Sequence, residues 1–330
     1  MKICIYGAGA IGGYLAVRLA TTGNEVSVVA RGGHLEAIKK NGLTLIADGQ
    51  ETNSRLSCSD NPEDFPIQDY VILAVKAHAG PSIARTLKPL LGAKTAVVPA
   101  VNGIPWWYFY KSGGNFDGYQ PQSVDPGGEQ WNLIGPERVI GCVVYPAAEI
   151  SEPGVIRHIS LNRFPIGEPD GSRSDRALLL SKVFTEAGLR APVRKKIRDD
   201  IWVKLWGNMS FNPVSVLTGA TLGQIGSNIE LHGVVREMMI EAREVGKSLG
   251  VNFPVDVDRR IAGATDVGDH KTSTLQDLEA GKAIELDALL GVVCELGELT
   301  GVKTPTCNTI NALARQRAAL VGSYQLAQRH

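Results

Sequence analysis

A lysine and two asparagines interrupt an otherwise apolar stretch of the sequence. Lys204, Asn208 and Asn212 follow one another at intervals of four residues, so on a helix with 3.6 residues per turn they would form one polar stripe. Apolar side chains occupy nearly every other direction, which predicts a helix that is covered all round. Unpaired, an ammonium group and two amides would be costly there, so we expect the stripe to face a cleft that holds polar ligand groups. A solvent-exposed stripe, with the lysine extended into water, is the alternative.

A glycine-rich turn near the N-terminus predicts a phosphate-binding loop. Residues 2–6 read as a strand, and a helical pattern opens with the next six residues, which are Gly7, Ala8, Gly9, Ala10, Ile11 and Gly12. In this context the GxGxxG pattern is typical of dinucleotide binding, because the helix N-terminus offers N–H groups and a positive dipole end to a pyrophosphate. Gly7 would permit the tight turn, Gly9 the approach of the pyrophosphate, and Gly12 close packing of the helix on the strand. A glycine-rich turn without a ligand is the alternative.

The residue after the second predicted strand bears on the choice of cofactor. An acidic residue at this place would bind the ribose hydroxyls of NAD. The sequence instead has Arg31, 19 residues after Gly12. A guanidinium suits a 2′-phosphate, which favours NADP(H), whereas a solvated arginine without a ligand is the competing interpretation.

A lysine combined with a nicotinamide cofactor indicates the chemistry of reduction. Hydride delivered from nicotinamide C4 to a ketone carbon leaves negative charge on the oxygen, which must be stabilised and protonated. An ammonium group performs both tasks. Lys204 is therefore the candidate proton donor.

Two domains must position these groups. The chain has 330 residues, whereas a single core usually stops growing at about 250 to 300 residues. Strands are expected at 2–6, 25–30, 68–75, 95–99 and 138–146. Helical periodicities without a convincing strand follow at about 200–218, 228–250, 255–266, 280–298 and 306–321. We therefore expect an α/β domain with βαβ connections over residues 1–195 and an all-α domain over residues 196–330.

Composition excludes several classes of function. Lys plus Arg equals Asp plus Glu at 34 each, so no net field would recruit nucleic acid or an anionic membrane surface. The five cysteines are scattered without CxxC pairs, which argues against a zinc or other metal site and fits a reducing compartment. The sequence shows neither a basic leader nor an apolar run of about 18 residues. We expect a cytoplasmic protein that acts on a small molecule.

Four segments together resemble the ketopantoate reductases. They are the glycine loop, VNG at 101–103, KLWGNMSFNP at 204–213 and STLQDLEAGKAIELD at 273–287. The resemblance covers most of the chain. It implies an N-terminal Rossmann domain that binds NADP and a C-terminal α-helical domain like that of 6-phosphogluconate dehydrogenase. It also implies that NADPH reduces 2-dehydropantoate to pantoate, a step towards pantothenate and coenzyme A.

The same resemblance implies roles for individual residues. Lys204 matches the catalytic lysine of the family and Glu285 its essential carboxylate. Glu285 would alternatively bind a substrate hydroxyl or be an exposed helix acid. Lys76 and Asn102 match residues beside the cofactor. Substrate contacts are implied for Asn102, Asn208, Asn212 and Ser273.

The spacing of two of these residues predicts a break in the chain's helical pattern. Ser273 and Gln276 read as a capping box that starts a helix. One unbroken helix would place Glu285 twelve residues further along, or about 18 Å away. Both residues would hardly reach one small acid. We therefore expect residues 273–281 to be irregular or a separate short turn, with the main helix starting near Gly281.

One region departs from the family pattern. An aromatic cluster at Trp106, Trp107, Tyr108, Phe109 and Tyr110 is followed by a Gly-, Pro- and Gln-rich segment at 111–130. The segment is expected to be a long surface loop. The cluster would form a wall for a substrate bulkier than ketopantoate, or else cover a domain seam or a dimer contact. A reductase of a bulkier 2-oxo acid and an NADP-binding regulator without turnover are thus the alternative functions, and a homodimer is plausible.

Overall fold

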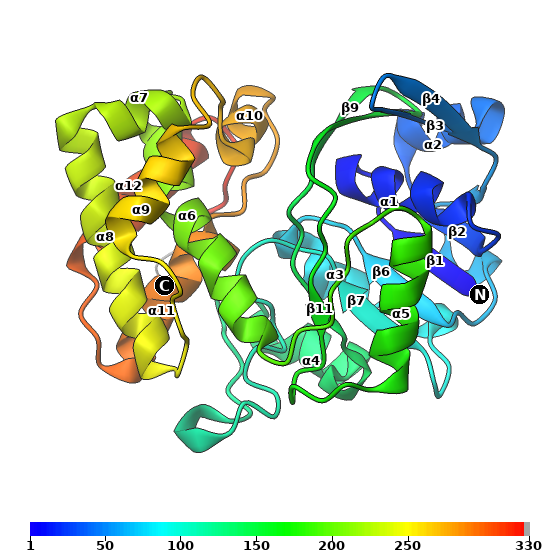
Figure 1. The fold of residues 1–330 in the computed structure, drawn as a ribbon, viewed down its shortest axis with the longest axis horizontal. Coiled ribbons are helices and arrows are strands. Elements are labelled where there is room, and N and C mark those ends of the chain that lie inside the picture. The colour runs from blue at the N-terminus through cyan, green and yellow to red at the C-terminus, as the bar shows by residue number, and fades with distance from the viewer. Residues whose placement is uncertain (327–330) are drawn as a thin grey trace. The chain divides into compact units, whose positions relative to one another are not determined.

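The computed structural model describes residues 1–326, and the chain divides into two compact units. The first unit comprises Met1–Gln120 and Asp125–Ile197, and the second comprises Pro121–Val124 together with the chain from Arg198 onward. The short segment 121–124 thus belongs to the second unit although its neighbours on both sides belong to the first. Figure 1 shows the elements of both units.

A five-stranded parallel sheet forms the centre of the first unit. Its order is β5-β2-β1-β6-β7, built from β1 (Lys2–Tyr6), β2 (Glu25–Val29), β5 (Ser57–Ser59), β6 (Tyr70–Leu73) and β7 (Ala96–Pro99). Every residue of β6 and β7 is buried, as parallel strands with both faces covered require. The strand order reverses between β1 and β6, which is the place where open α/β sheets bind ligands.

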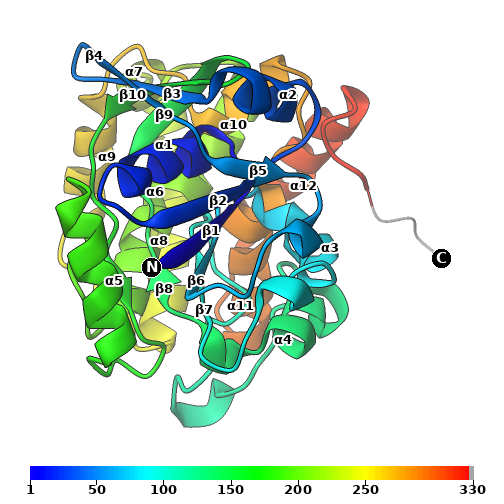
Figure 2. The same ribbon diagram turned by 90° about the vertical axis from the view of Figure 1, so that its right-hand side faces the viewer.

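A second sheet, of four strands, covers the first helix. Its order is β4-β3-β10-β9, built from β3 (Leu43–Ala47), β4 (Gln50–Ser54), β9 (Ala147–Glu152) and β10 (Val155–Ser160). Helix α1 (Ala10–Ala20) lies between the two sheets and is buried along most of its length (Figure 2). Gly13 permits this close packing, because a Cβ at that position would lie 2.6 Å from Cγ1 of Ile156 on β10.

Shorter elements complete the first unit. Its other helices are α2 (Gly32–Asn41), α3 (Gly80–Ala84), α4 (Glu129–Ile134) and α5 (Asp175–Glu186), and β8 (Gly141–Cys142) pairs antiparallel with β11 (Ile166–Gly167). Single 3-10 turns lie at Pro62–Asp64, Ala77–Ala79, Lys88–Leu90, Gly114–Phe116, Pro126–Gly128 and Pro136–Arg138.

The predicted strand at 138–146 is wrong over most of its length. The N–H of Ile140 donates to Val97, but the N–H groups of Val143 and Tyr145 donate to the chain at residues 165 and 163. This apolar run therefore leaves the parallel sheet after a few residues, and only Gly141–Cys142 forms a strand. The four other predicted strands are confirmed as β1, β2, β6 and β7.

The described part of the second unit contains helices and no strand. These are α6 (Ile197–Thr218), α7 (Leu222–Ser227), α8 (Ile229–Ser248), α9 (Val257–Thr265), α10 (Ser273–Glu279), α11 (Val292–Thr300) and α12 (Pro305–Leu320), with a π-helical turn η7 (Asp287–Gly291) before α11. The expected helix at 280–298 is partly wrong, because residues 281–285 are not helical. The predicted α/β domain followed by an all-α domain is confirmed as a fold class.

Helix α6 is covered on nearly all sides, as its sequence predicted. Trp202 and Trp206 are fully buried, and the indole N–H of Trp206 donates to the carbonyl of Met239 on α8 at 2.6 Å. The helix runs through Pro213 without a break in its assignment. Burial on both sides of the helix explains why its apolar residues follow no single stripe.

The aromatic cluster and the segment after it are more buried than the sequence suggested. All of the cluster except Tyr110 is buried, and a Cβ on Gly141 would lie 2.6 Å from the ring of Trp107. The expectation of one long surface loop at 111–130 is wrong for its second half, because Asp125 is fully buried and accepts the N–H groups of Gln130 and Trp131 at the start of α4. Residues 111–118 are mostly exposed.

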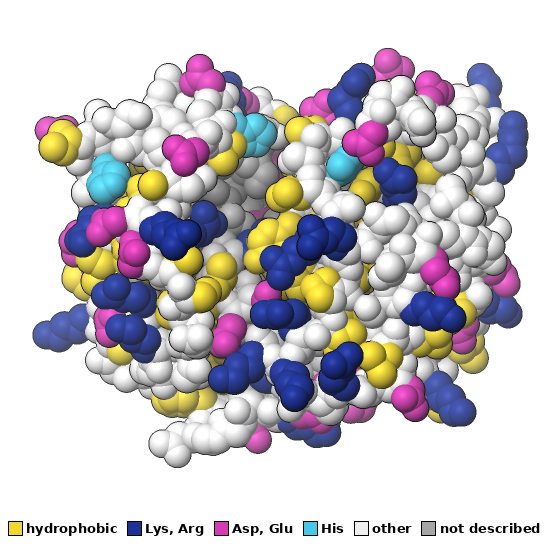
Figure 3. Space-filling view, viewed as in Figure 1, with side chains coloured by type: hydrophobic (Ala, Val, Ile, Leu, Met, Phe, Trp, Pro, Cys, Tyr) yellow, Lys and Arg dark blue, Asp and Glu magenta, His cyan; other side chains and the backbone are white. Residues whose placement is uncertain are grey.

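The surface carries charges of both signs. Lys and Arg side chains lie among Asp and Glu side chains over the face shown in Figure 3, in keeping with a formal net charge of zero. Among the residues that the structure describes, no helix is both long and apolar enough to cross a membrane. Over the same residues, no three His, Cys, Asp or Glu side chains are grouped to hold a metal ion.

Candidate active site

The glycine loop has the backbone that a phosphate-binding turn needs. Gly7 has a φ of +100°, and a Cβ at Gly12 would lie 1.8 Å from the carbonyl oxygen of Gly7. Both positions are therefore closed to larger residues. In contrast, a Cβ at Gly9 would meet nothing within 4 Å, so the loop has open space at the N-terminus of α1. No acidic residue stands in the first turn of α1, which leaves the positive end of the helix available to an anion.

Arg31 lies next to this loop at the end of β2. The N–H of Gly7 donates to the carbonyl of Val29 at 2.9 Å, so the chain that leaves β2 starts beside the loop. Arg31 is exposed and is the N-cap residue of α2. A guanidinium in this place has the reach and charge for a phosphate near the end of the strand.

His34 fastens α2 to the second sheet. Its Nδ1 accepts a hydrogen bond of 3.0 Å from the N–H of Gly154, in the turn between β9 and β10. Burial lowers the pKa of His34 below its ordinary value, and an interaction with the backbone of Ala8 offsets part of that shift. The ring therefore stays neutral at pH 7 and serves as an acceptor.

Lys76 and Asn102 lie at the same edge of the sheet as the glycine loop. The ladder continues past β6 and β7, since the N–H of Ala74 donates to Tyr6 and that of Ala100 donates to Leu73, each at 2.9 Å. Lys76 and Asn102 follow two residues later in each case and are half-buried. The structure thus brings the predicted cofactor residues of the first unit together at the carboxyl ends of the strands, where the reversal of strand order predicts a ligand.

The three residues of the polar stripe on α6 differ in how deeply they are buried. Lys204 and Asn208 are half-buried, whereas Asn212 is 6% exposed. The amide nitrogen of Asn212 donates to Oγ1 of Thr274 on α10 at 2.9 Å. Asn212 thus joins α6 to α10. The sequence did not identify Thr274 as its partner, because the two residues are 62 positions apart.

The break predicted before Glu285 is present, although its bounds differ from those expected. α10 is a separate helix of seven residues, and helical structure resumes at Leu286 instead of near Gly281. Thr272 caps α10, since its hydroxyl accepts the N–H of Leu275 at 3.2 Å. The capping box assigned to Ser273 is therefore wrong, and Ser273 is the first, exposed residue of the helix. Glu285 is 7% exposed and lies beyond the break.

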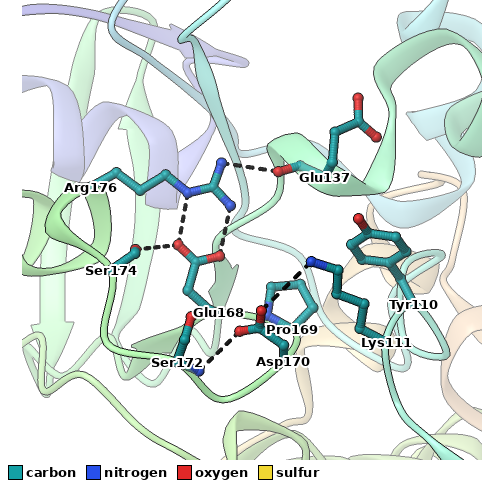
Figure 4. A pocket seen from close by; sticks show the side chains of 9 residues that line it. All are labelled: Tyr110, Lys111, Glu137, Glu168, Pro169, Asp170, Ser172, Ser174 and Arg176. Carbon is teal, nitrogen blue, oxygen red and sulfur yellow. Dashed lines mark hydrogen bonds and ion pairs between the residues drawn. The ribbon is translucent and has the colours of Figure 1, made fainter.

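A separate pocket lies at the opposite edge of the first unit's sheet (Figure 4). At its floor Glu168, which is 4% exposed, accepts hydrogen bonds of 2.7 Å from Nε and Nη2 of Arg176. The hydroxyl of Tyr70, the first residue of β6, donates to the carbonyl of Arg176 at 2.8 Å. These contacts place the pocket at the amino ends of the strands, away from the glycine loop, and its polar floor joins α5 to the sheet.

These two units together define an oxidoreductase that binds a nicotinamide dinucleotide on a Rossmann unit and carries a second, all-helical unit. A family model described as "Ketopantoate reductase PanE/ApbA" matches residues 3–171, and one described as "Ketopantoate reductase PanE/ApbA C terminal" matches residues 196–318. The chain belongs to the ketopantoate reductase family, as its sequence motifs predicted.

Relatives match the chain over nearly its whole length. The 2-dehydropantoate 2-reductase of Mesorhizobium japonicum is 54% identical over 325 residues, which are 98% of this chain and 100% of the relative. A crystal structure of a protein from Ralstonia solanacearum MolK2, named as a ketopantoate reductase, has a TM-score of 0.93 and 41% identity and covers 98% of this chain and 99% of its own. A PanE/ApbA family ketopantoate reductase from Ralstonia eutropha JMP134 has a TM-score of 0.84 and 28% identity, covering 97% and 99%.

Proposed function

We propose that the protein reduces 2-dehydropantoate to pantoate with NADPH as hydride donor. The observation that carries this proposal is the full-length match, at 54% identity, to the 2-dehydropantoate 2-reductase of Mesorhizobium japonicum. Membership of the family supports an NADPH-dependent oxidoreductase. The residues of both units supply groups that suit this chemistry.

The first unit fits the cofactor. The open space above Gly9 would admit the pyrophosphate, and the N–H groups at the start of α1 would bind it. Arg31 would bind the 2′-phosphate. Lys76 and Asn102 would contact the cofactor at the neighbouring strand ends, where Asn102 would also reach the substrate. The bound cofactor supplies the hydride.

The second unit would supply the proton and hold the substrate. Addition of hydride to the 2-oxo carbon converts the carbonyl into an alkoxide, and the ammonium of Lys204 would stabilise that charge and transfer one proton to the oxygen. Ser273 would bind the substrate carboxylate, and Asn208 and Asn212 would orient the substrate. Glu285 would act as the essential carboxylate of the site, where it would bind a substrate hydroxyl or the lysine.

The alternative of a bulkier 2-oxo acid has less support than ketopantoate. It depends on the aromatic cluster at 106–110 forming a substrate wall, yet every member except Tyr110 is buried. Tyr108 and Phe109 contact one another edge to face, and Phe109 contacts Tyr119 in the same way. These rings contact one another within the first unit.

Initial rates across a panel of substrates test this proposal. Nicotinamide absorbance is followed with ketopantoate and with straight-chain, branched and aromatic 2-oxo acids, each with NADPH and with NADH. We expect the highest kcat/KM with ketopantoate and NADPH. A higher kcat/KM with an aromatic 2-oxo acid would overturn the substrate assignment, and binding of NADPH without turnover on any acid would indicate a regulator.

Three further proposals concern organisation and setting. Residues 1–195 would serve as the cofactor domain and residues 196–330 as the substrate domain. A cytoplasmic location is supported by five cysteines that are all present as thiols, which fits a reducing compartment. A homodimer is supported by exposed Leu313 and Leu320 on α12, and a molar mass measured by light scattering tests it.

A further inference from the structure

The segment that carries Glu285 has no regular structure of its own. Residues 281–285 lie between the end of α10 and the helix that resumes at Leu286. Helical hydrogen bonds therefore do not fix the backbone of Glu285. The groups that hold its neighbours on both sides therefore help to set its position.

On one side, the C-terminal turn holds the segment. The N–H of Ile284 donates to the carbonyl of Ser323 at 3.1 Å. Ile284 and Leu286 are buried in one small core with Val216, Ala314 and Ala318, and Tyr324 packs against that core. The residues that flank Glu285 are thus anchored to α12 and to the turn that follows it.

On the other side, a cluster of polar side chains holds the start of η7. The carboxylate of Asp287 forms an ion pair with Nη2 of Arg315 on α12. It also accepts the hydroxyl of Tyr324 at 2.8 and 3.0 Å. Burial and the nearby Asp287 carboxylate raise the pKa of Tyr324, so its hydroxyl keeps the proton that it donates.

The π-helical turn provides the space for this cluster. The N–H of Val292 donates to the carbonyl of Asp287, five residues earlier, which is the bond that defines a π-helix. A Cβ added to Gly291, within the same turn, would lie 2.7 Å from Nη2 of Arg315 and 3.2 Å from Oδ1 of Asp287. The absence of a side chain at Gly291 therefore lets Arg315 reach Asp287. Single π-turns of this kind occur frequently at functional sites.

We propose that Asp287, Arg315 and Tyr324 are positioning residues that hold Glu285 in place for the reaction. This inference rests on the proposed function, in which Glu285 is the essential carboxylate. The cluster acts through Glu285 and touches neither substrate nor cofactor. Loss of the cluster should therefore impair catalysis without weakening the binding of NADPH, because the glycine loop that is predicted to bind NADPH belongs to the first unit.

Substitution of the carboxylate tests the positioning role. Asp287→Asn keeps the shape of the side chain but removes the charge that Arg315 binds. We expect kcat/KM for ketopantoate to fall by roughly ten- to hundredfold, the scale of a displacement of about 1 Å in a catalytic group, with a raised KM and an unchanged Kd for NADPH. Tyr324→Phe removes one hydroxyl and should give a smaller loss in the same direction. Asp258→Asn, which weakens an exposed ion pair with Arg236 elsewhere in the second unit, is the matched control and should leave kcat/KM unchanged.

A double-mutant cycle separates positioning from general stability. If Asp287 acts through Glu285, the Glu285→Gln/Asp287→Asn double variant should be as slow as Glu285→Gln alone. Losses that multiply in the double variant would overturn the inference. A normal kcat/KM for the Asp287→Asn single variant would also overturn it, provided that the Glu285→Gln single variant is slow. An unchanged rate for Glu285→Gln, or a wild-type protein inactive on ketopantoate, would instead overturn the proposed function together with this inference.

A glycine pair gives an independent test that removes no polar group. Gly291→Ala places a methyl group against Nη2 of Arg315, whereas Gly233→Ala on α8 meets nothing within 4 Å. Alanine favours both helices over glycine. We expect Gly291→Ala to lower kcat/KM and Gly233→Ala to leave it unchanged, with thermal midpoints measured for both. Equal kcat/KM for the two variants would contradict the role of the Arg315–Asp287 contact.

Discussion

Lys204 stands apart from the other lysines because its helix is buried on nearly all sides. It is half-buried on α6, one helical turn before Asn208. Lys204→Ala should lower kcat by roughly a hundredfold or more, the usual loss for a positioned proton donor, while the Kd for NADPH stays unchanged. Lys247→Ala, which removes an exposed lysine from α8, is the control. An undiminished kcat in Lys204→Ala would exclude the lysine as proton donor.

Arg31 is the residue from which NADP was predicted. It is exposed at the end of β2, beside the glycine loop. Arg31→Ala should weaken the binding of NADPH far more than that of NADH, because only NADPH carries the 2′-phosphate. Fluorescence titration with each cofactor measures the two Kd values. Arg55→Ala, an exposed arginine ahead of β5, should leave both Kd values unchanged, and equal weakening of both cofactors by Arg31→Ala would show that Arg31 does not read the phosphate.

His34 makes the stability of the first unit depend on pH. Its folded-state pKa is lowered by burial from an ordinary value near 6.5, so the unfolded chain takes up the proton first as pH falls. Neutral His34 therefore stabilises the fold fully at pH values above the pKa of His34 in the unfolded chain. This stabilisation is lost as the pH falls through the lower pKa of His34 in the folded protein. Protonation would also remove the Nδ1 acceptor of the Gly154 N–H.

Denaturant unfolding of wild type and His34→Asn measures this effect. The asparagine side chain in this variant would keep an acceptor near the place of Nδ1 but does not titrate. The advantage of wild type over the variant should shrink between about pH 7.5 and about pH 5. A difference in the free energy of unfolding that stays constant over this range would contradict the assignment.

At the scale of elements, the sequence predicted what depends on periodicity and local chemistry. β1, β2, β6 and β7 are buried runs, and α6 and α8 have long helical patterns, so the core elements were visible. The break before Glu285 followed from geometry alone. The start of the next helix was placed too early, because the segment before Leu286 is held by a contact far away in the sequence, the hydrogen bond from the N–H of Ile284 to the carbonyl of Ser323. The second sheet was not predicted either, since β4 is polar and mostly exposed and gains its structure by pairing with β3.

Two glycines of the βα turn at the glycine loop allow the requirements of folding and of cofactor binding to be tested separately. A Cβ at Gly9 meets nothing within 4 Å, whereas one at Gly12 meets backbone of Gly7 at 1.8 Å. Gly9→Ala should therefore keep a thermal midpoint close to wild type but weaken NADPH binding, because the methyl group would occupy the space that we propose for the pyrophosphate. Gly12→Ala should lower the midpoint itself. NADPH binding unaffected by Gly9→Ala would show that the open space is not the phosphate site.

At the scale of the molecule, two units were predictable from chain length and the change of pattern near residue 198. The sequence did not predict that a short segment before residue 198 also belongs to the second unit. Pro121–Val124 belongs to that unit, although its Gly-, Pro- and Gln-rich surroundings read as a surface loop. The composition of a segment indicates its local flexibility. Whether the segment docks on another part of the protein depends on a partner far away in the sequence, which here is Glu295.

The docking of this segment depends on one carboxylate. Glu295 on α11 accepts the N–H groups of Gln122 and Ser123, each at 2.7 Å, while Pro121 and Val124 are buried. Glu295→Gln replaces one acceptor oxygen by an N–H₂ group that faces a donor. Since a hydrogen bond to a charged group contributes about 1.5 to 3 kcal/mol, we expect the segment to detach more often. Limited proteolysis should then cut residues 111–124 faster than in wild type.

The same helix offers the control for this prediction. Glu298→Gln changes an exposed carboxylate one turn further along α11 and should leave the cutting rate unchanged. Because the charge change is identical in the two variants, any difference between them reports on the contact with the Gln122 and Ser123 backbone. Equal cutting rates would mean that burial of Pro121 and Val124 holds the segment without Glu295, so that apolar packing and not the carboxylate anchors this part of the chain.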